Sequence, residues 1–174
     1  MENNTEDFIQ LYSGRAFHFG NPRVEEVHIE DIAHALSLLC RFGGHCREFY
    51  SVADHSIRCA ENVPKEFRLE ALLHDATEAY IVDMPRPIKY VLKEYKVVED
   101  NIDKVIRQKF GLPDTISPEV KEIDARMLST ERRDLMKPSE LEWHKMLDPI
   151  DQIVYPRTPK ESYNDFLEMF KELS

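Results

Sequence analysis

The sequence has no apolar run as long as a membrane-spanning helix requires, and no basic stretch followed by an apolar one of the kind that signal peptides carry. We therefore expect a soluble protein of the cytoplasm that does not act in a membrane. Cysteine is also scarce, since Cys40, Cys46 and Cys59 are the only three and no pair has the Cys-x-x-Cys spacing of a zinc site. Their odd number predicts reduced thiols that pack as small apolar side chains, and argues against a disulfide framework.

Basic residues are in the minority: 23 lysines and arginines stand against 33 aspartates and glutamates, which gives a formal net charge of −10. Binding to DNA or RNA depends on clustered basic side chains that neutralise phosphates, so this charge argues against a nucleic-acid polymer as partner. The sequence also lacks a glycine-rich phosphate loop and a Gly-x-Ser-x-Gly motif. A small anionic substrate is compatible with the composition, because a metal ion and a few nearby cations make a positive pocket on an acidic surface.

Helical periodicity dominates the chain. Without repeats, low-complexity tracts or a long linker, the sequence is expected to form a single domain over residues 1–174. Apolar residues recur at helical spacing, which predicts an all-α bundle. The expected helices cover residues 29–42, 52–62, 64–82, 88–110 and 118–136, and a last one starts at residue 159. Residues 11–19 alternate around Gly14 and are expected to form a short β-ribbon or extended N-terminal arm.

Local residues predict where several of these helices begin and end. Ser51 and Asp54 form a variant of the capping box at the start of the second helix. Gly43-Gly44 is expected to end the first helix, with Arg41 in its last turn. Ser117-Pro118-Glu119 combines an N-cap residue, a first-turn proline and an acid that suits the helix dipole, so it predicts the start of the fifth helix.

Two adjacent ionisable residues, His74 and Asp75, interrupt the apolar face of the expected helix over residues 64–82. Leu69, Leu72 and Leu73 are spaced to face the core, so the pair is expected at the edge of that face. A buried imidazole and carboxylate need a strong partner. A divalent metal ion is the commonest partner that satisfies both groups.

Four residues on three expected helices are candidate metal ligands: His55, His74, Asp75 and Asp124. Asp124 falls among the apolar residues of its helix, as a ligand that faces inward would. Two imidazoles and two carboxylates favour Co, Mn, Zn, Ni or Fe at an open site over a closed structural zinc site, which prefers thiolates. Any one of the four, taken alone, is more often a hydrogen-bonded structural residue. The prediction therefore depends on the set.

The order His55, His74-Asp75, Asp124 matches the H…HD…D pattern of HD-domain metal-dependent phosphohydrolases. The chain also resembles the bacterial 5′-deoxynucleotidases and the related phage dATP triphosphohydrolases at residues 41–42 (RF), 52–56 (VADHS), 74–78 (HDATE) and 83–89 (DMPRPIK). In those proteins an Arg-Trp pair precedes an E-H-S segment, an H-D-x-x-E motif and a D-x-P-x-P-x-K run. The similarity covers most of the domain, and it departs at Phe42, where the relatives carry Trp. Base preference is therefore left open.

This resemblance implies an HD-domain helical bundle that uses a metal-activated water to cleave the 5′ phosphate ester of a deoxynucleotide. It implies catalytic roles for Glu78 and Asp83, as the groups that move protons or position water. It implies substrate binding by Arg41, Phe42 and Lys89. Homo-oligomers are also implied, because related enzymes form them.

The residues by themselves support these roles less strongly. Glu78 follows His74 by four positions and so shares its helical face, although a solvated glutamate at a helix end is an equally ordinary interpretation. Arg41 suits bidentate binding of phosphate, or it complements the C-terminus of the first helix. Spacing alone makes Asp83 a turn residue and Lys89 a solvated lysine.

Three functional hypotheses follow. The first is a 5′-deoxynucleotidase, with a dATP or dNTP triphosphohydrolase as its close variant. The second is an HD phosphodiesterase or guanosine-alarmone hydrolase, which uses the same metal ligands. The third is a non-catalytic, metal-stabilised module that binds a nucleotide or a protein.

The basic cluster Arg132-Arg133 offers no further site. Glu131 and Asp134 flank it in the sequence, and mixed charges of this kind are typical of a solvated helix face. We therefore expect Glu131 to lie at the surface.

Overall fold

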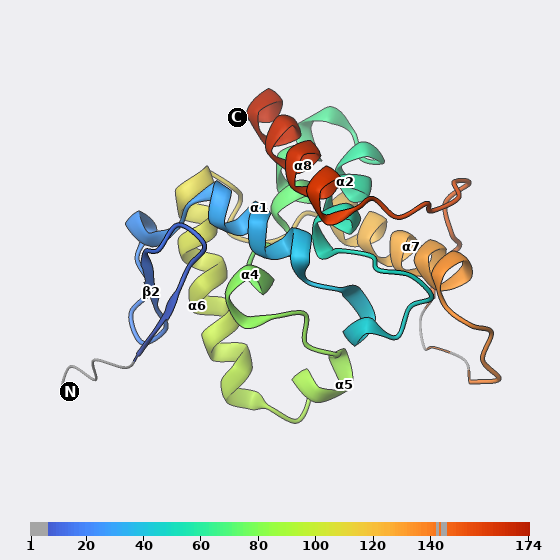
Figure 1. Ribbon diagram of the computed structural model, residues 1–174, viewed down its shortest axis with the longest axis horizontal. Helices are drawn as coiled ribbons and strands as arrows, with labels where there is room; N and C mark the ends of the chain where they lie inside the picture. Colours follow the sequence, from blue (N-terminus) through green and yellow to red (C-terminus); the bar gives the residue numbers. More distant parts are fainter. Residues whose placement is uncertain (1–6, 142, 144–145) are drawn as a thin grey trace.

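The computed structural model describes residues 7–141, 143 and 146–174 (Figure 1). Its only sheet in the described part is an antiparallel hairpin of β1 (Phe8–Gln10) and β2 (Ala16–His18), with Ile9 opposite Phe17. The expected β-ribbon is therefore confirmed, but only its second strand lies within residues 11–19, because the first ends at Gln10. Phe17 is fully buried and stacks on Tyr80 at 4.0 Å between ring centroids, which fixes the hairpin to the helices.

The described chain is mostly helical, so the expected all-α class is confirmed at this level. The helices are α1 (Ile29–Leu38), α2 (Val52–Glu61), α3 (Arg68–Leu73), α4 (Glu78–Ile81), α5 (Arg86–Lys89), α6 (Lys93–Phe110), α7 (Pro118–Leu135) and α8 (Pro159–Leu173). Short 3₁₀ turns are η1 (Val24–Glu26), η2 (Arg41–Gly44) and η3 (Lys65–Phe67). Among these described helices, none is long and apolar enough to cross a membrane.

Helix α2 lies at the centre of the bundle and contacts α1, α3, α7 and α8 (Figure 1). Its side chains are almost all buried, and several are small, which lets the neighbouring helices approach closely. The hydroxyl of Ser51 accepts from the backbone N–H of Asp54, as the capping prediction requires. The carboxylate of Asp54 instead accepts from Arg58 and Arg157, and so ties the segment before α8 to α2.

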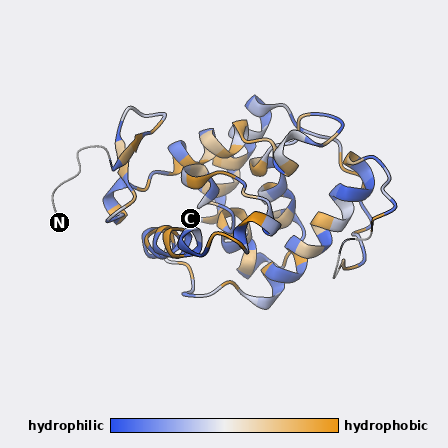
Figure 2. Cartoon of the chain, turned by 90° about the horizontal axis from the view of Figure 1, so that it is seen from below, coloured by the Kyte–Doolittle hydropathy of each residue, from blue (hydrophilic) through white to orange (hydrophobic). Residues whose placement is uncertain are grey.

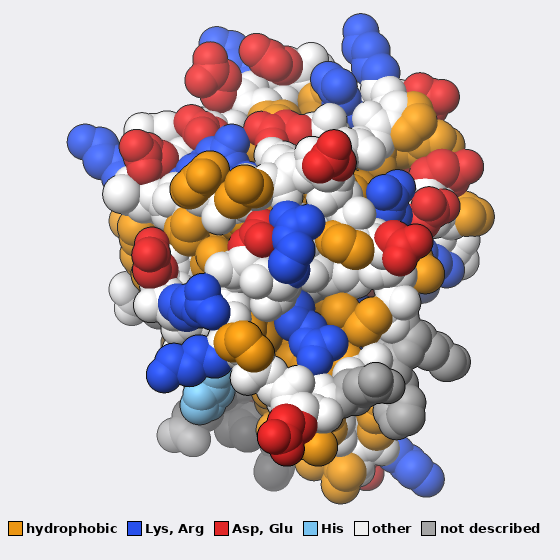
Figure 3. Space-filling view, turned by 90° about the vertical axis from the view of Figure 1, so that its right-hand side faces the viewer, with side chains coloured by type: hydrophobic (Ala, Val, Ile, Leu, Met, Phe, Trp, Pro, Cys, Tyr) orange, Lys and Arg blue, Asp and Glu red, His pale blue; other side chains and the backbone are white. Residues whose placement is uncertain are grey.

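The longer helices carry hydrophobic residues on one side and hydrophilic residues on the other (Figure 2). On the face shown in Figure 3, acidic and basic side chains are mixed in the upper part, and further lysines and arginines lie near the middle and at the lower left.

The first helix is shorter than expected. It ends at Leu38, and Cys40 pairs with Ser51 across an isolated antiparallel bridge. Backbone hydrogen bonds from Arg41 to Tyr50 and from Val52 to Leu39 hold this bridge. Because a distant segment supplies these partners, the chain leaves the helix before reaching Gly43-Gly44. Arg41 therefore lies in η2, and the predicted role as a cation in the last turn of this helix is wrong.

The expected helix over residues 64–82 is broken in two. Helix α3 ends at Leu73, α4 begins at Glu78, and residues 74–77 form a turn closed by hydrogen bonds from Ala76 to Leu73 and from Glu78 to Asp75. The predicted apolar face is confirmed, since Leu72, Leu73, Ala76 and Tyr80 are all buried. The break places His74 and Asp75 in a tight turn instead of a continuous helix.

The expected helix over residues 88–110 also begins later. Residues 86–89 form the short α5, and α6 starts at Lys93. Gly111, with φ of 65°, ends α6. Helix α7 starts after Ser117 as predicted, but the Ser117 side chain does not cap it. The backbone N–H and the hydroxyl of Ser117 both donate to Glu70 on α3, at 2.9 and 2.6 Å. These bonds anchor α7 to the helix that precedes His74.

The last helix begins at Pro159 as predicted. Thr158 and Glu161 form a reciprocal capping box at its start. Helix α8 packs on α1, α2 and α3, with Phe166 fully buried. This packing completes the core around α2.

Candidate metal centre

Nitrogen and oxygen atoms of the four predicted ligands converge at one point. His55 comes from α2, His74 and Asp75 from the turn after α3, and Asp124 from α7. Nε2 of His55 lies 3.3 Å from Nε2 of His74, 3.3 Å from Oδ1 of Asp124 and 3.6 Å from Oδ2 of Asp75. Nε2 of His74 lies 3.3 Å from Asp75 Oδ2 and 3.9 Å from Asp124 Oδ1.

Donor atoms that each lie about 2.0–2.2 Å from one ion are about 3.0–3.5 Å from one another. Three of the five distances are 3.3 Å and fall in this range, whereas those from His55 to Asp75 and from His74 to Asp124 are longer, at 3.6 and 3.9 Å. The four side chains are therefore close to the spacing that a shared metal ion requires. The side chains of His55 and His74 are 0% and 4% exposed, whereas those of Asp75 and Asp124 are 22% and 25% exposed. The imidazoles therefore close the inner side of the cluster, and the carboxylates border its open side, which solvent reaches.

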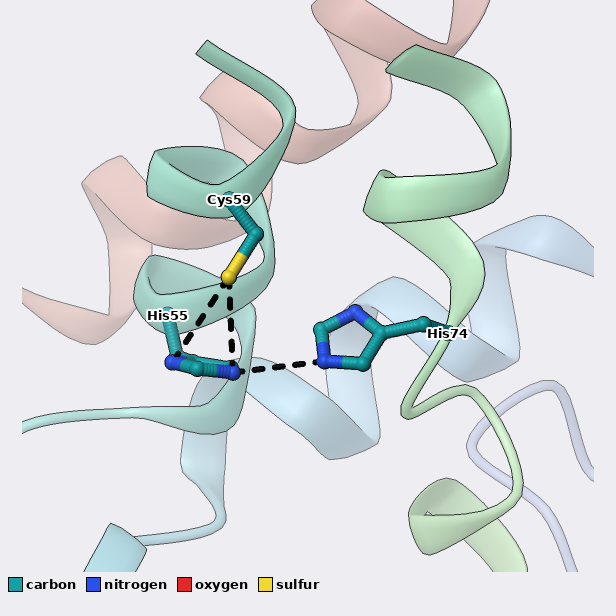
Figure 4. A group of neighbouring side chains, drawn as sticks. All are labelled: His55, Cys59 and His74. Carbon is teal, nitrogen blue, oxygen red and sulfur yellow. Dashed lines mark hydrogen bonds between the residues drawn. The ribbon is translucent and has the colours of Figure 1, made fainter. Parts of the chain in front are cut away.

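Cys59 is a third possible partner of the two histidines (Figure 4). His55, Cys59 and His74 each offer a ligand atom within 4.8 Å of the others, so this group could hold a metal ion. However, Sγ of Cys59 lies 3.6 Å from Nε2 and 4.0 Å from Nδ1 of His55. Nearly equal distances place the sulfur over the face of the ring, whereas a bound ion lies in the ring plane. Burial also raises the pKa of the Cys59 thiol, which disfavours the thiolate.

The two carboxylates are therefore better companions for the histidines than Cys59 is. Burial acts to raise the pKa of Asp124, but the nearby His55, His74 and Arg41 lower it well below its ordinary value. Asp124 is thus ionised. Burial and Arg41 oppose protonation of His55, yet its neighbours Cys59, Glu131 and Asp124 raise its pKa well above the ordinary value. Both shifts indicate that this cluster stabilises positive charge at its centre.

Glu131 lies behind the cluster and is fully buried. Its Oε1 is 2.5 Å from Nδ1 of His55 and accepts from the Tyr50 hydroxyl at 2.8 Å, while Oε2 accepts from Nε of Arg41 at 3.2 Å. The expectation of a solvated Glu131 is wrong, because Arg41, His55 and Tyr50 reach it from other segments. One sequence signal was available: Glu131 follows Asp124 by seven positions and so lies on the same helical face.

Glu78 is only 5% exposed, so the interpretation as a solvated glutamate at a helix end is wrong. Within the described part of the chain its Oε2 has no hydrogen-bond partner. Burial, together with the negative charges of Asp75 and Asp83, raises the pKa of Glu78 well above its ordinary value. Asp83 is half-buried in the segment between α4 and α5. Glu78 thus lies near the candidate ligand Asp75, to whose carbonyl oxygen its backbone N–H donates, and Asp83 lies near Glu78.

Of the predicted substrate-binding residues, Arg41 lies against the cluster, with Nη1 3.4 Å from Oδ2 of Asp75. Phe42 has the left-handed φ of 58°, which is unusual for a bulky residue, and the Arg41 guanidinium lies 5.5 Å from its ring centroid. Lys89 makes its hydrogen bond outside the cluster, because its ammonium donates to Glu99 on α6 at 2.7 Å.

Arg86 was not predicted as a site residue. Its Nη2 lies 3.4 Å from Oδ2 of Asp124, and its side chain is 66% exposed. An exposed pair of this kind contributes little to stability. It nevertheless adds a cation beside the open edge of the cluster.

Comparisons with known proteins do not name an activity. No family model matches the chain. Protein YfdR of Escherichia coli K12, described as uncharacterized, is 46% identical over 171 residues, which are 96% of this chain and 96% of YfdR. An uncharacterized protein of Rhodobacter capsulatus is 34% identical over 122 residues, which are 64% of this chain and 62% of that protein. With near-complete coverage at this identity, the chain belongs to the same protein family as YfdR.

Proposed function

We propose that this protein is a metal-dependent phosphohydrolase, built on an HD domain over residues 1–174, that cleaves the 5′ phosphate ester of deoxynucleotides. The observation that carries the proposal is the convergence of two imidazole nitrogens and two carboxylate oxygens from three separate segments: each nitrogen lies 3.3–3.9 Å from the other nitrogen and from an oxygen of both carboxylates. Such a mixed set suits Co, Mn, Zn, Ni or Fe. When bound, such an ion would supply a Lewis acid for the phosphate and lower the pKa of a water molecule.

The open side of the cluster supports turnover over a purely structural metal. The side chains of Asp75 and Asp124 keep 22% and 25% of their surface exposed, so the cluster is open to solvent on the carboxylate side. A structural site instead closes all its positions with protein ligands. In the proposed reaction, water attacks the phosphorus, the bond from phosphorus to the 5′ oxygen breaks, and that oxygen takes up a proton as the nucleoside leaves.

Glu78 is the proposed proton donor. Its raised pKa keeps a fraction of the carboxyl groups protonated nearer neutral pH than an ordinary glutamate would be, and its Oε2 is not occupied by another described side chain. The carboxylate left after this donation takes up the proton that the attacking water loses, so Glu78 is protonated again at the end of each turnover. Asp83 is proposed to orient the water or the 5′ oxygen from the neighbouring segment.

Arg41 is the proposed phosphate ligand. One N–H group points at Asp75 and Nε points at Glu131, so the guanidinium is held firmly beside the cluster. A rigid, permanently charged fork next to a metal ligand is well placed to contact a phosphate oxygen. Phe42 and Lys89 are proposed to contact the nucleoside and the more distant phosphates, on the basis of the family resemblance.

The proposal is tested by the phosphorus products. Purified protein is incubated with dAMP, dATP, a phosphodiester or a guanosine alarmone in the presence of Co²⁺ or Mn²⁺, and the products are identified by ³¹P NMR. Orthophosphate from dAMP establishes a 5′-deoxynucleotidase, and tripolyphosphate from dATP establishes the triphosphohydrolase variant. Matched samples contain a chelator or the H74A variant, and both should be inactive.

Other outcomes contradict the proposal in distinguishable ways. Products from the phosphodiester or the alarmone alone would assign the second hypothesis. If no phosphorus compound is consumed while metal raises the unfolding temperature, the protein is a metal-stabilised binding module.

A further inference from the structure

The two histidines of the candidate metal centre are held differently from behind. Nδ1 of His74 lies 2.7 Å from the backbone carbonyl oxygen of Ala71, a neutral acceptor. Nδ1 of His55 lies 2.5 Å from Oε1 of Glu131, a carboxylate. Both contacts leave Nε2 of the ring facing the cluster, but only His55 has an acidic partner.

The Glu131 carboxylate accepts from the Arg41 guanidinium at Oε2 and from the Tyr50 hydroxyl at Oε1. A carboxylate in contact with a permanently charged guanidinium is held in its ionised form. An ionised carboxylate can only accept hydrogen bonds, so the proton between Glu131 and His55 lies on Nδ1 of His55. The lone pair of a neutral His55 is then on Nε2, the atom that faces His74, Asp75 and Asp124. A strong acceptor at Nδ1–H also makes the ring a better donor to a metal.

A purely structural role explains this arrangement less well. To hold Arg41 alone, one oxygen of Glu131 would suffice, and Oε2 already accepts from that guanidinium. Oε1 instead receives both the Tyr50 hydroxyl and His55. The carboxylate thus contacts the ring of His55 through Oε1 and the guanidinium of Arg41 through Oε2, in a site with 0% exposure.

We propose that Glu131 is a positioning residue that fixes His55 with its proton on Nδ1 and strengthens Nε2 as a metal donor, and so sets the metal affinity of the protein. This inference rests on the metal centre of the proposed function, but it does not depend on which phosphate ester is cleaved. Glu131 contacts both Arg41 and His55, so this one carboxylate positions the predicted phosphate ligand and a metal ligand together.

The test compares the E131Q variant with the wild-type protein by titration with Co²⁺ or Zn²⁺ alone, without nucleotide. Loss of a carboxylate behind a metal-bound histidine is expected to weaken metal binding by about 10–100-fold. The matched control is Y50F, which removes a hydrogen bond to the same oxygen and keeps the carboxylate, and which should bind metal nearly as the wild type does. Circular dichroism and the unfolding temperature of the metal-free variants establish that both are folded at the titration temperature.

The inference is wrong if folded E131Q binds metal with wild-type affinity, or if Y50F weakens binding as much as E131Q does. If E131Q does not fold, the Zn²⁺-loaded wild type decides, because NMR can locate the proton of His55. A solvent-protected proton on Nδ1 supports the proposal, and metal ligation through Nδ1 overturns it. A wild type that binds no metal overturns the metal centre itself, and this inference with it.

Discussion

His55 and His74 point their Nε2 atoms at each other across 3.3 Å, although 19 positions separate them in the sequence. The Nδ1 atoms of both rings are engaged on the far side, by Glu131 and by the Ala71 carbonyl. A neutral imidazole with its proton on Nδ1 presents a lone pair at Nε2, so two such rings would direct lone pairs at each other. A cation between them relieves this repulsion, and the adjacent Asp75 and Asp124 supply the compensating negative charge.

Replacing His74 by alanine should remove both metal binding and phosphate release. Loss of a residue that hydrogen-bonds to a metal ligand typically weakens metal binding by about 10–100-fold. H74A removes one of the four converging donors itself, so we expect a larger loss of metal affinity. Metal content after dialysis and phosphate release are measured on the same samples. The control is H28A, because His28 is half-buried at the start of α1 and makes no side-chain cap there. An H74A protein that keeps its metal and its activity would disprove the assignment.

Replacing Cys59 by alanine should leave metal affinity unchanged, because its sulfur lies over the ring of His55 and not beside Nε2. The variant is expected to lose about 1 kcal/mol of unfolding free energy to the small cavity that remains. D124A, by contrast, should lose the metal. Optical spectra of the Co²⁺-loaded wild type provide an independent check, since a sulfur-to-cobalt charge-transfer band would show that Cys59 is a ligand.

Replacing Glu78 by glutamine should leave the metal bound and slow turnover. Loss of a general acid or base typically lowers the rate by about 10²–10⁴-fold, and we expect kcat to fall within this range while KM changes little. The control is E94Q, which alters an exposed glutamate in the first turn of α6. Wild-type kcat in E78Q would remove Glu78 from the mechanism.

The raised pKa of Glu78 also predicts a pH-dependent stability. A carboxyl whose pKa is higher in the folded protein than its ordinary value of 4.5 stabilises the fold below that pH, and this contribution is lost as the pH rises toward the folded-state pKa. Glutamine does not ionise, so E78Q has no such contribution to lose as the pH rises. The unfolding free energy of metal-free E78Q should therefore gain on that of the wild type as pH increases above 4.5. Denaturant unfolding in the presence of a chelator measures the difference, and a difference independent of pH would contradict the shift.

Replacing Glu70 by alanine should destabilise the fold by loosening α7 from α3. Glu70 is 4% exposed and accepts from the backbone and hydroxyl of Ser117, and Nη1 of Arg107 lies 3.5 Å from its Oε1. Leaving such buried groups without their partner costs about 1–3 kcal/mol of unfolding free energy. The exposed Glu66 provides the control, because E66A should change the free energy by no more than about 0.5 kcal/mol. Equal unfolding midpoints for E70A and E66A would show that this anchor is unimportant.

Helical spacing was sufficient to predict most of the helices and the buried sides of several. Leu72, Leu73 and Tyr80 are buried as their spacing indicates, because the side that faces the core is set by a period of 3.6 residues. The starts of α2, α7 and α8 were also predicted, since caps and first-turn prolines act within a few residues. The order and spacing of His55, His74, Asp75 and Asp124 were enough to nominate the metal centre.

Other features depend on partners that lie far away in the sequence. The end of α1 depends on Ser51, which pairs with Cys40. The buried state of Glu131 depends on Arg41, His55 and Tyr50, which supply a cation and two donors that compensate for its lost hydration. Local charge patterning favoured a solvated Glu131, because the sequence around it contains none of these partners.

Short-range preferences of the backbone and the period of the apolar residues therefore account for the helical class of this protein and for its candidate ligands. Which donors face each other, and which carboxylate stands behind His55, follow only from the packing of α2 against α3 and α7. The physical reason is that ionisable side chains are tolerated inside a protein only with compensating partners, and those partners come together only when distant segments pack.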